Sequence, residues 1–102
     1  MILKNIKINQ FKKGGKMQLR PILKNEIFQT IANIIAVNRD ILPGTVLINS
    51  NFKEDLEIDS ITMFEIIMDV ELHYGIFFED EKTENIVIVE NLLDLVFEKI
   101  EK

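Results

Sequence analysis

The segment from Asp59 to Tyr74 contains neither glycine nor proline, and Gly75 follows it directly. Acidic residues lie in and near its first turns, where the dipole of a helix favours negative charge. A glycine just past the last turn is a common way for a helix to end. Apolar side chains recur along the segment at helical spacing. The segment therefore predicts an α-helix over 59–74, and a short chain built around it is expected to be helical.

This predicted helix is apolar on two opposite sides when its residues are placed at the helical period. One side has the composition of an ordinary core face and consists of Met63, Ile66, Ile67, Val70 and Tyr74. The opposite side carries a second apolar stripe, formed by Ile61, Phe64, Met68 and Leu72 and flanked by Glu65, Asp69 and Glu71. Burial on both sides is hard to arrange in 102 residues. The second stripe is therefore either a docking surface for a partner or a second core face.

Three further segments have helical patterns. Pro21 suits the first turn of a helix, and the isoleucines after it predict a helix over 22–37. The acidic residues after Phe78 predict a short helix over 80–85, and amphipathic spacing predicts a terminal helix over 90–101. Residues 87–89 have the composition of a strand, but no alternating segment is available to pair with them.

The predicted fold is all-α: a small bundle of three main helices plus one short helix. A long loop over 38–58 connects the first two helices, which is unusual in so small a domain. Its apolar side chains can hold it against the helices, and they are Ile41, Leu42, Val46, Leu47, Ile48, Phe52, Leu56 and Ile58.

Charge divides the chain into two unequal parts. Residues 1–25 carry seven basic residues and no acid, whereas residues 26–102 carry all 17 acids and five basic residues, a formal balance of −12. We expect the acidic part over 26–102 to repel nucleic acid and to be attracted to basic surfaces of partner proteins. The basic residues 1–20, interrupted by Gly14-Gly15, are expected to form a flexible extension before a domain over 21–102. No apolar run approaches the ~20 residues of a membrane span, and no secretion signal is recognisable, so we expect a cytoplasmic monomer.

The side chains that most catalytic and metal sites need are missing. The chain has no cysteine and one histidine, His73, which excludes thiol chemistry, cysteine-ligated metals and multi-histidine sites. A calcium loop starting at Asp55 would need a glycine at its sixth position and a glutamate at its twelfth, and this chain has Ser60 and Ile66 there. We therefore expect no metal site.

Ser60 stands where the long loop meets the helix over 59–74. A nucleophilic serine needs an adjacent base, and His73 lies about 20 Å further along the same helix. The chain is therefore not expected to be an enzyme. Judged from the local pattern alone, Asp59 and Ser60 are both typical helix N-caps.

The stretch Phe52-Lys-Glu-Asp-Leu-Glu-Ile-Asp-Ser-Ile61, with Glu65 five residues after the serine and Tyr74-Gly75-Ile76 beyond, resembles the acyl carrier protein family. That family's usual pattern is Phe-x-x-Asp-Leu-Gly-x-Asp-Ser-Leu, then an acidic helix and Phe-Gly-Ile. Glu57 departs from it where glycine is usual, and Thr62 departs where carriers of fatty acid synthesis have aspartate.

The resemblance implies that Ser60 is the attachment site of 4′-phosphopantetheine, which a phosphopantetheinyl transferase moves from coenzyme A. Asp59 would help to engage the transferase and its metal ion. The thiol of the arm would carry acyl groups as thioesters in fatty acid, polyketide or specialised acyl pathways. Basic surfaces of synthases and acyl-transferring enzymes would dock on Ile61, Phe64, Glu65, Met68, Asp69 and Leu72. The alternative is a small acidic helical interaction module in which Ser60 is only a helix cap.

Overall fold

The computed structural model describes residues 24–101, in which four helices and one 3₁₀ turn follow one another. They are α1 (Lys24–Arg39), η1 (Pro43–Thr45), α2 (Ser60–Tyr74), α3 (Asp80–Thr83) and α4 (Val89–Glu101). The described residues contain no strand, so the predicted all-α class of three main helices and one short helix is confirmed. The expected basic extension over 1–20 and the expected helix start near Pro21 lie outside the described residues.

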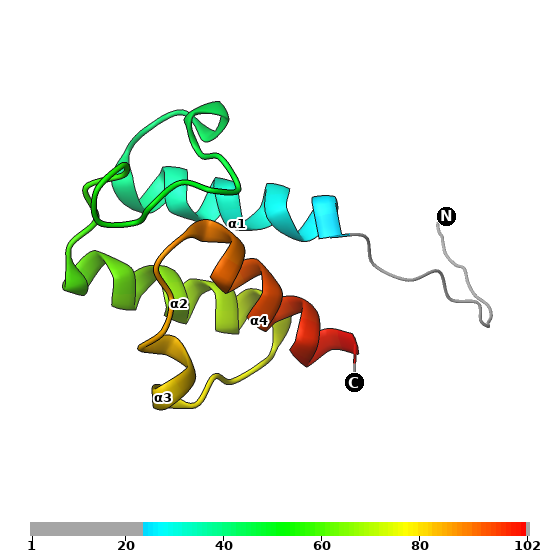
Figure 1. Cartoon of the computed structure of the whole chain (residues 1–102). Helices are drawn as coiled ribbons and strands as arrows, with labels where there is room; N and C mark the ends of the chain where they lie inside the picture. Colours follow the sequence, from blue (N-terminus) through cyan, green and yellow to red (C-terminus); the bar gives the residue numbers. More distant parts are fainter. Residues whose placement is uncertain (1–23, 102) are drawn as a thin grey trace, which may run out of the picture.

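The core lies where α1 meets α2 and α4 (Figure 1). Each of these helices contributes one apolar stripe, and the fully buried members are Ile27, Ile31, Ile35, Ile66, Val70, Val89, Leu92, Leu93 and Val96. Burying such side chains is the main favourable contribution to folding. The three long helices are therefore held together mainly by apolar packing.

The long loop between α1 and α2 is attached to this core by some of its apolar side chains but not by all. Val46, Phe52, Leu56 and Ile58 are buried, as expected. Leu42, Leu47 and Ile48 are exposed, which corrects the expectation that they also pack against the helices. Short exposed runs, such as residues 47–49 and 53–55, therefore separate the buried side chains of the loop.

The segment before α4 has a pairing partner after all, contrary to the sequence prediction. Ile88 forms an isolated antiparallel bridge with Asn51 of the long loop. Beside it the Phe52 N–H donates to the Val87 carbonyl at 3.0 Å, and the Val89 N–H donates to the Ser50 carbonyl at 3.0 Å. The partner was missed because it is a short piece of loop without strand periodicity. These bonds satisfy backbone groups at the start of α4.

The helix ends differ slightly from the predicted ones. The first helix continues to Arg39, where Asp40 adopts a left-handed conformation (φ 63°) and the Ile41 N–H donates to the Ala36 carbonyl. The short helix ends at Thr83 rather than at residue 85. None of the helices in the described range is both long and apolar enough to cross a membrane.

Candidate functional site

Ser60 is the first residue of α2, and Asp59 is its N-cap. The Asp59 carboxylate accepts a hydrogen bond from the Thr62 N–H at 2.8 Å. This bond, with further hydrogen bonding from Thr62, lowers the pKa of Asp59 below its ordinary value. The suggestion that Ser60 is the cap is therefore wrong: Asp59 does the capping, and the exposed Ser60 hydroxyl is left for another role.

The three residues before Asp59 are fixed from both sides. Leu56 and Ile58 are buried, and the Ile58 N–H donates to the Phe52 carbonyl at 2.9 Å. From the end of α1, the Arg39 Nε donates to the Leu56 carbonyl at 3.0 Å. The position of Ser60 is thus determined by the core and by a residue from another helix.

Glu57 lies between these two anchors in a left-handed backbone conformation, with φ at 54°. This conformation suits glycine and is unfavourable for a residue with a Cβ. The resembling family usually has glycine at this position, and the geometry gives the reason. The Glu57 carboxylate also pairs with Arg39 at 3.3 Å, although its side chain remains 76% exposed.

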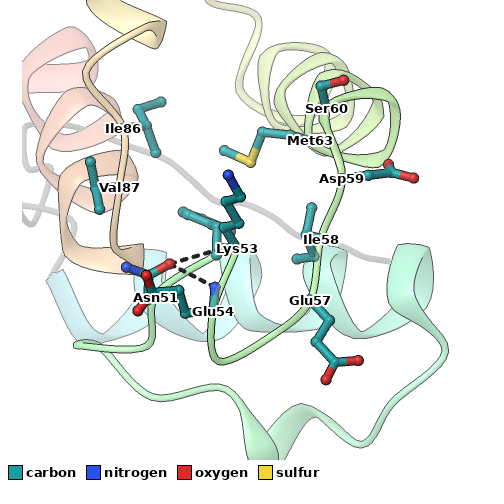
Figure 2. A pocket seen from close by; sticks show the side chains of 11 residues that line it. Asn51, Lys53, Glu54, Glu57, Ile58, Asp59, Ser60, Met63, Ile86 and Val87 are labelled. Atoms are coloured by element: carbon teal, nitrogen blue, oxygen red, sulfur yellow. Dashed lines mark hydrogen bonds between the residues drawn. The ribbon is translucent and has the colours of Figure 1, made fainter.

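A cleft of about 790 Å³ opens beside Ser60 (Figure 2). Its walls come from the loop before α2, from the first turn of α2 and from the segment that joins α3 to α4. The apolar side chains among its lining are Phe52, Ile58, Met63, Ile86 and Val87. A long, narrow group attached to Ser60 can therefore lie along an apolar wall.

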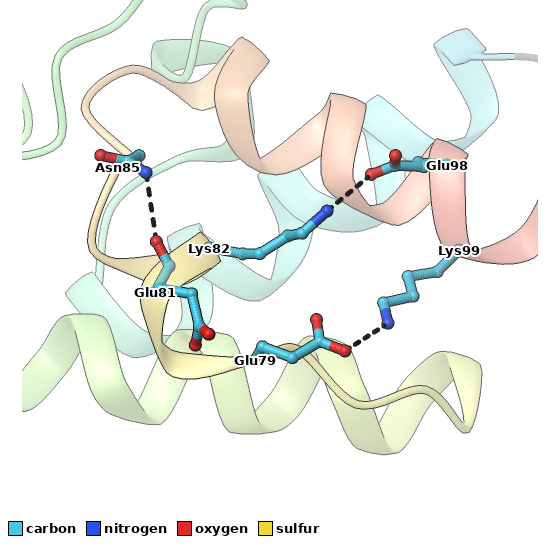
Figure 3. A network of polar contacts seen from close by, with 6 residues as sticks. All are labelled: Glu79, Glu81, Lys82, Asn85, Glu98 and Lys99. Carbon is cyan, nitrogen blue, oxygen red and sulfur yellow. Dashed lines mark hydrogen bonds and ion pairs between the residues drawn. The ribbon is translucent and has the colours of Figure 1, made fainter.

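The wall formed by Ile86 and Val87 follows α3, which polar contacts hold against α4 (Figure 3). Lys82 pairs with Glu98 at 3.8 Å, and Lys99 pairs with Glu79 at 3.4 Å. Exposed pairs of this kind contribute little to stability. The Ile86–Val87 wall itself is held by the Phe52 N–H, which donates to the Val87 carbonyl, and by the packing of Ile86 against the core.

The two opposite faces of α2 differ in burial as their patterns indicate. Ile66 and Val70 are completely buried on one face. The second stripe is exposed: Ile61 at 70%, Phe64 at 63%, Met68 at 43% and Leu72 at 77% of the residue's full area. The reading of this stripe as a second core face is therefore excluded.

The three flanking carboxylates differ in what they contact. Glu65 is exposed, with no hydrogen bond or ion pair among the described residues. Asp69 accepts a hydrogen bond from the Asn38 side chain of α1 at 2.9 Å. Glu71 accepts one from the Phe78 N–H at 2.9 Å and so supports the turn after α2. Only Glu65 is wholly available to a partner.

The surroundings of Ser60 provide no means of activating its hydroxyl. His73 lies in the last turn of α2, at the opposite end of the helix from Ser60. No group of acidic or histidine side chains in the described part of the chain is arranged to hold a metal ion.

Curated proteins with similar sequences cover most of the chain, whereas no family model matches it. An acyl carrier protein of Petrotoga mobilis is 32% identical over 77 residues, which span 76% of this chain and 91% of that protein. One of Rubrobacter xylanophilus is 37% identical over 75 residues, spanning 74% of this chain and 93% of that protein. One of Thermosynechococcus vestitus is 31% identical over 77 residues, spanning 76% and 95%.

The chain belongs to the acyl carrier protein family. Members of this family are carriers rather than enzymes, and they bear a covalent 4′-phosphopantetheine group that synthases and transferases recognise. The predicted family, its carrier function and its prosthetic group are therefore confirmed. An exposed serine at the start of a helix, beside an apolar-walled cleft, fits such an arm.

Sequence reasoning missed three residues around this site: Arg39, Asn38 and Lys53. Arg39 holds the loop before Ser60, Asn38 binds Asp69, and Lys53 lines the cleft. One signal was available for Lys53, because it is a single basic residue directly before the acidic run 54–59. Nothing in the local pattern marked Asn38.

Proposed function

We propose that this acyl carrier holds its 4′-phosphopantetheine on Ser60. The observation that supports this most is the exposed Ser60 hydroxyl, which the Asp59 cap leaves without a structural task at the mouth of the cleft. In the loading step the Ser60 oxygen forms a bond to the phosphorus next to pantetheine in coenzyme A. The bond within the pyrophosphate breaks, adenosine 3′,5′-bisphosphate leaves, and the serine proton passes to a base of the transferase.

We propose that the transferase supplies that base, since His73 lies at the far end of α2 from Ser60. Asp59 lies directly before Ser60, is exposed and is ionised at neutral pH. It is thus suited to contact the transferase and the metal ion that accompanies coenzyme A. The thiol at the end of the arm then carries acyl intermediates as thioesters, which accounts for a carrier without cysteine.

The exposed stripe of α2 is the proposed docking face for the transferase and for synthases that use the acyl group. It consists of Ile61, Phe64, Met68 and Leu72 with Glu65 and Asp69 beside them. Apolar side chains bordered by carboxylates fit an apolar surface bordered by basic residues. The formal charge of −12 over residues 26–102 adds long-range attraction to such partners. We further propose that the carrier acts as a cytoplasmic monomer.

Intact mass spectrometry tests the attachment site. The apo protein is incubated with coenzyme A, magnesium and a broad-specificity phosphopantetheinyl transferase. We expect the wild type to gain one phosphopantetheinyl group and Ser60→Ala to gain none. Ser50 is an internal control, since it is buried and its oxygen accepts a hydrogen bond from the Leu47 N–H. An unmodified wild type with several transferases, or modification at Ser50, would show that the proposal is wrong.

A further inference from the structure

The cleft beside Ser60 has an unusual charge distribution. Eleven residues line it, and three of them are acidic: Glu54, Glu57 and Asp59. Lys53 is the one basic residue among the eleven. The second basic group nearby, Arg39, is already engaged with the Leu56 carbonyl and with Glu57. Among the residues that line this cleft, Lys53 is therefore the cation with which a negative group at its mouth can pair.

The backbone of Lys53 is held in place, although its side chain is exposed. Its N–H donates to the Asn51 Oδ1 at 2.9 Å. Phe52 beside it is buried, and the Phe52 N–H is bonded to the Val87 carbonyl. The base of the side chain thus starts from a defined point on the cleft wall.

The Lys53 ammonium makes no hydrogen bond or ion pair with residues 24–100, even though three carboxylates share the cleft. Figure 2 shows the side chain extending from the loop toward α2, where Met63 and Ser60 lie. The Lys53 ammonium is therefore unpaired among these residues and extends toward Met63 in the first turn of α2, the turn that begins with Ser60.

We propose that Lys53 is a positioning residue that binds the phosphodiester of the arm on Ser60 and directs the arm into the cleft. This inference rests on the proposed attachment at Ser60. The phosphodiester is negative and lies next to the ionised Asp59, so the two groups repel each other. The N-terminus of α2 offsets part of this repulsion, and the Lys53 ammonium offsets more of it from the cleft side. The phosphate then stays on the side of Ser60 that faces the apolar wall.

The experiment uses fully loaded holo protein, with loading checked by intact mass, and compares the wild type with Lys53→Gln and Lys53→Arg. Lys24→Gln is the matched control: Lys24 is also an exposed lysine, and it lies at the start of α1, the opposite end of the bundle from the start of α2 (Figure 1). Two signals are recorded: the phosphorus resonance of the phosphodiester and the line widths of the pantetheine methyl groups.

We expect Lys53→Gln to shift the phosphorus resonance and to sharpen the methyl lines, because the arm becomes more mobile. Lys53→Arg should keep the wild-type values, and Lys24→Gln should change nothing. Added salt should move the wild type toward Lys53→Gln, because exposed charges are screened. If the phosphorus resonance and the methyl line widths change no more in Lys53→Gln than in Lys24→Gln, the role of Lys53 is overturned. The proposed attachment at Ser60 would still stand. A protein that takes up no arm at Ser60 would overturn the proposed function and this inference together.

Discussion

The Arg39 Nε donates a hydrogen bond to the Leu56 carbonyl at 3.0 Å and so connects the end of α1 to the loop four residues before Ser60. The same guanidinium pairs with the Glu57 carboxylate at 3.3 Å. Arg39 thus helps the core to fix the loop that leads to Ser60. Neither contact involves α2 itself.

Arg39→Ala should therefore lower the free energy of unfolding and slow the loading of Ser60. A hydrogen bond that involves a charged group contributes about 1.5–3 kcal/mol, and the loop also loses a contact with α1. Chemical denaturation and a time course of intact mass give the two quantities. Lys24→Ala removes an exposed pair with Asp94 and the contact of the Lys24 ammonium with the Phe97 ring, 5.0 Å from its centroid, and should cost about 1 kcal/mol or less. Equal effects of the two changes would contradict the role given to Arg39.

Glu57→Gly should be more stable than Glu57→Ala by about 1 kcal/mol, because both lose the Arg39 pair and only the alanine keeps a Cβ at φ 54°. Comparing the two variants separates backbone strain from the ion pair. Denaturant midpoints at equal slope provide the measurement. A Glu57→Ala protein as stable as Glu57→Gly would show that this backbone position carries no strain.

The Asp59 cap should make stability depend on pH at the acid end. Hydrogen bonding to Thr62 lowers the pKa of Asp59 below its ordinary value of 3.8 in the folded state. The contribution of the ionised Asp59 cap to the free energy of unfolding is therefore fully present above pH 3.8. It is lost as the pH falls through the lower pKa that Asp59 has in the folded state. Melting temperatures of the wild type and Asp59→Asn should differ less at very low pH than at neutral pH. Asp59→Ala should melt several degrees lower than the wild type at neutral pH, since the cap is gone.

Glu65→Lys should slow the encounter with a basic transferase while leaving the fold intact. The carboxylate is exposed and has no bonding partner among the described residues, so its removal costs little stability. Loading rates should fall severalfold at low salt and converge with the wild type at high salt. A rate that is independent of this charge at low salt would show that Glu65 is only a solvated side chain.

Asp69→Lys should behave differently from Glu65→Lys, although the sequence treats the two as equivalent. Asp69 also accepts a hydrogen bond from Asn38 at 2.9 Å and thus joins α2 to α1. We expect a loss of about 0.5–1.5 kcal/mol in unfolding free energy besides the slower loading. Asn38→Ala provides the control, since it removes the bond and keeps the charge.

Met68→Ala and Ile66→Ala should separate the two faces of α2. Ile66 is completely buried, and a large-to-small change there costs about 2–5 kcal/mol. Met68 is 43% exposed, so Met68→Ala should lower the free energy of unfolding by much less than Ile66→Ala does. Its main effect should be weaker binding of partners. Denaturation and loading rates together report both effects. A Met68→Ala loss as large as that of Ile66→Ala would mean that the stripe is core.

The limits of α2 and its two faces could be predicted from the sequence because they depend on residues within about one turn. Gly75 ends the helix in a left-handed conformation, with φ at 65°, as its position indicated. Pattern alone could not decide between Asp59 and Ser60 as the cap, because both residue types suit it. A single hydrogen bond from Thr62 decides the matter.

The sequence by itself determined the helices, the exposed stripe and the serine at the loop–helix junction, since each follows from the local periodicity of apolar and capping residues. Only the tertiary structure decided how the long loop runs and what meets at Ser60. Arg39 reaches Leu56, Asn38 reaches Asp69, and Asn51 pairs with Ile88 across distances of 17 to 37 positions in the chain. Such contacts depend on how α1, α2 and α4 pack against one another, and no pattern of neighbouring residues records that packing.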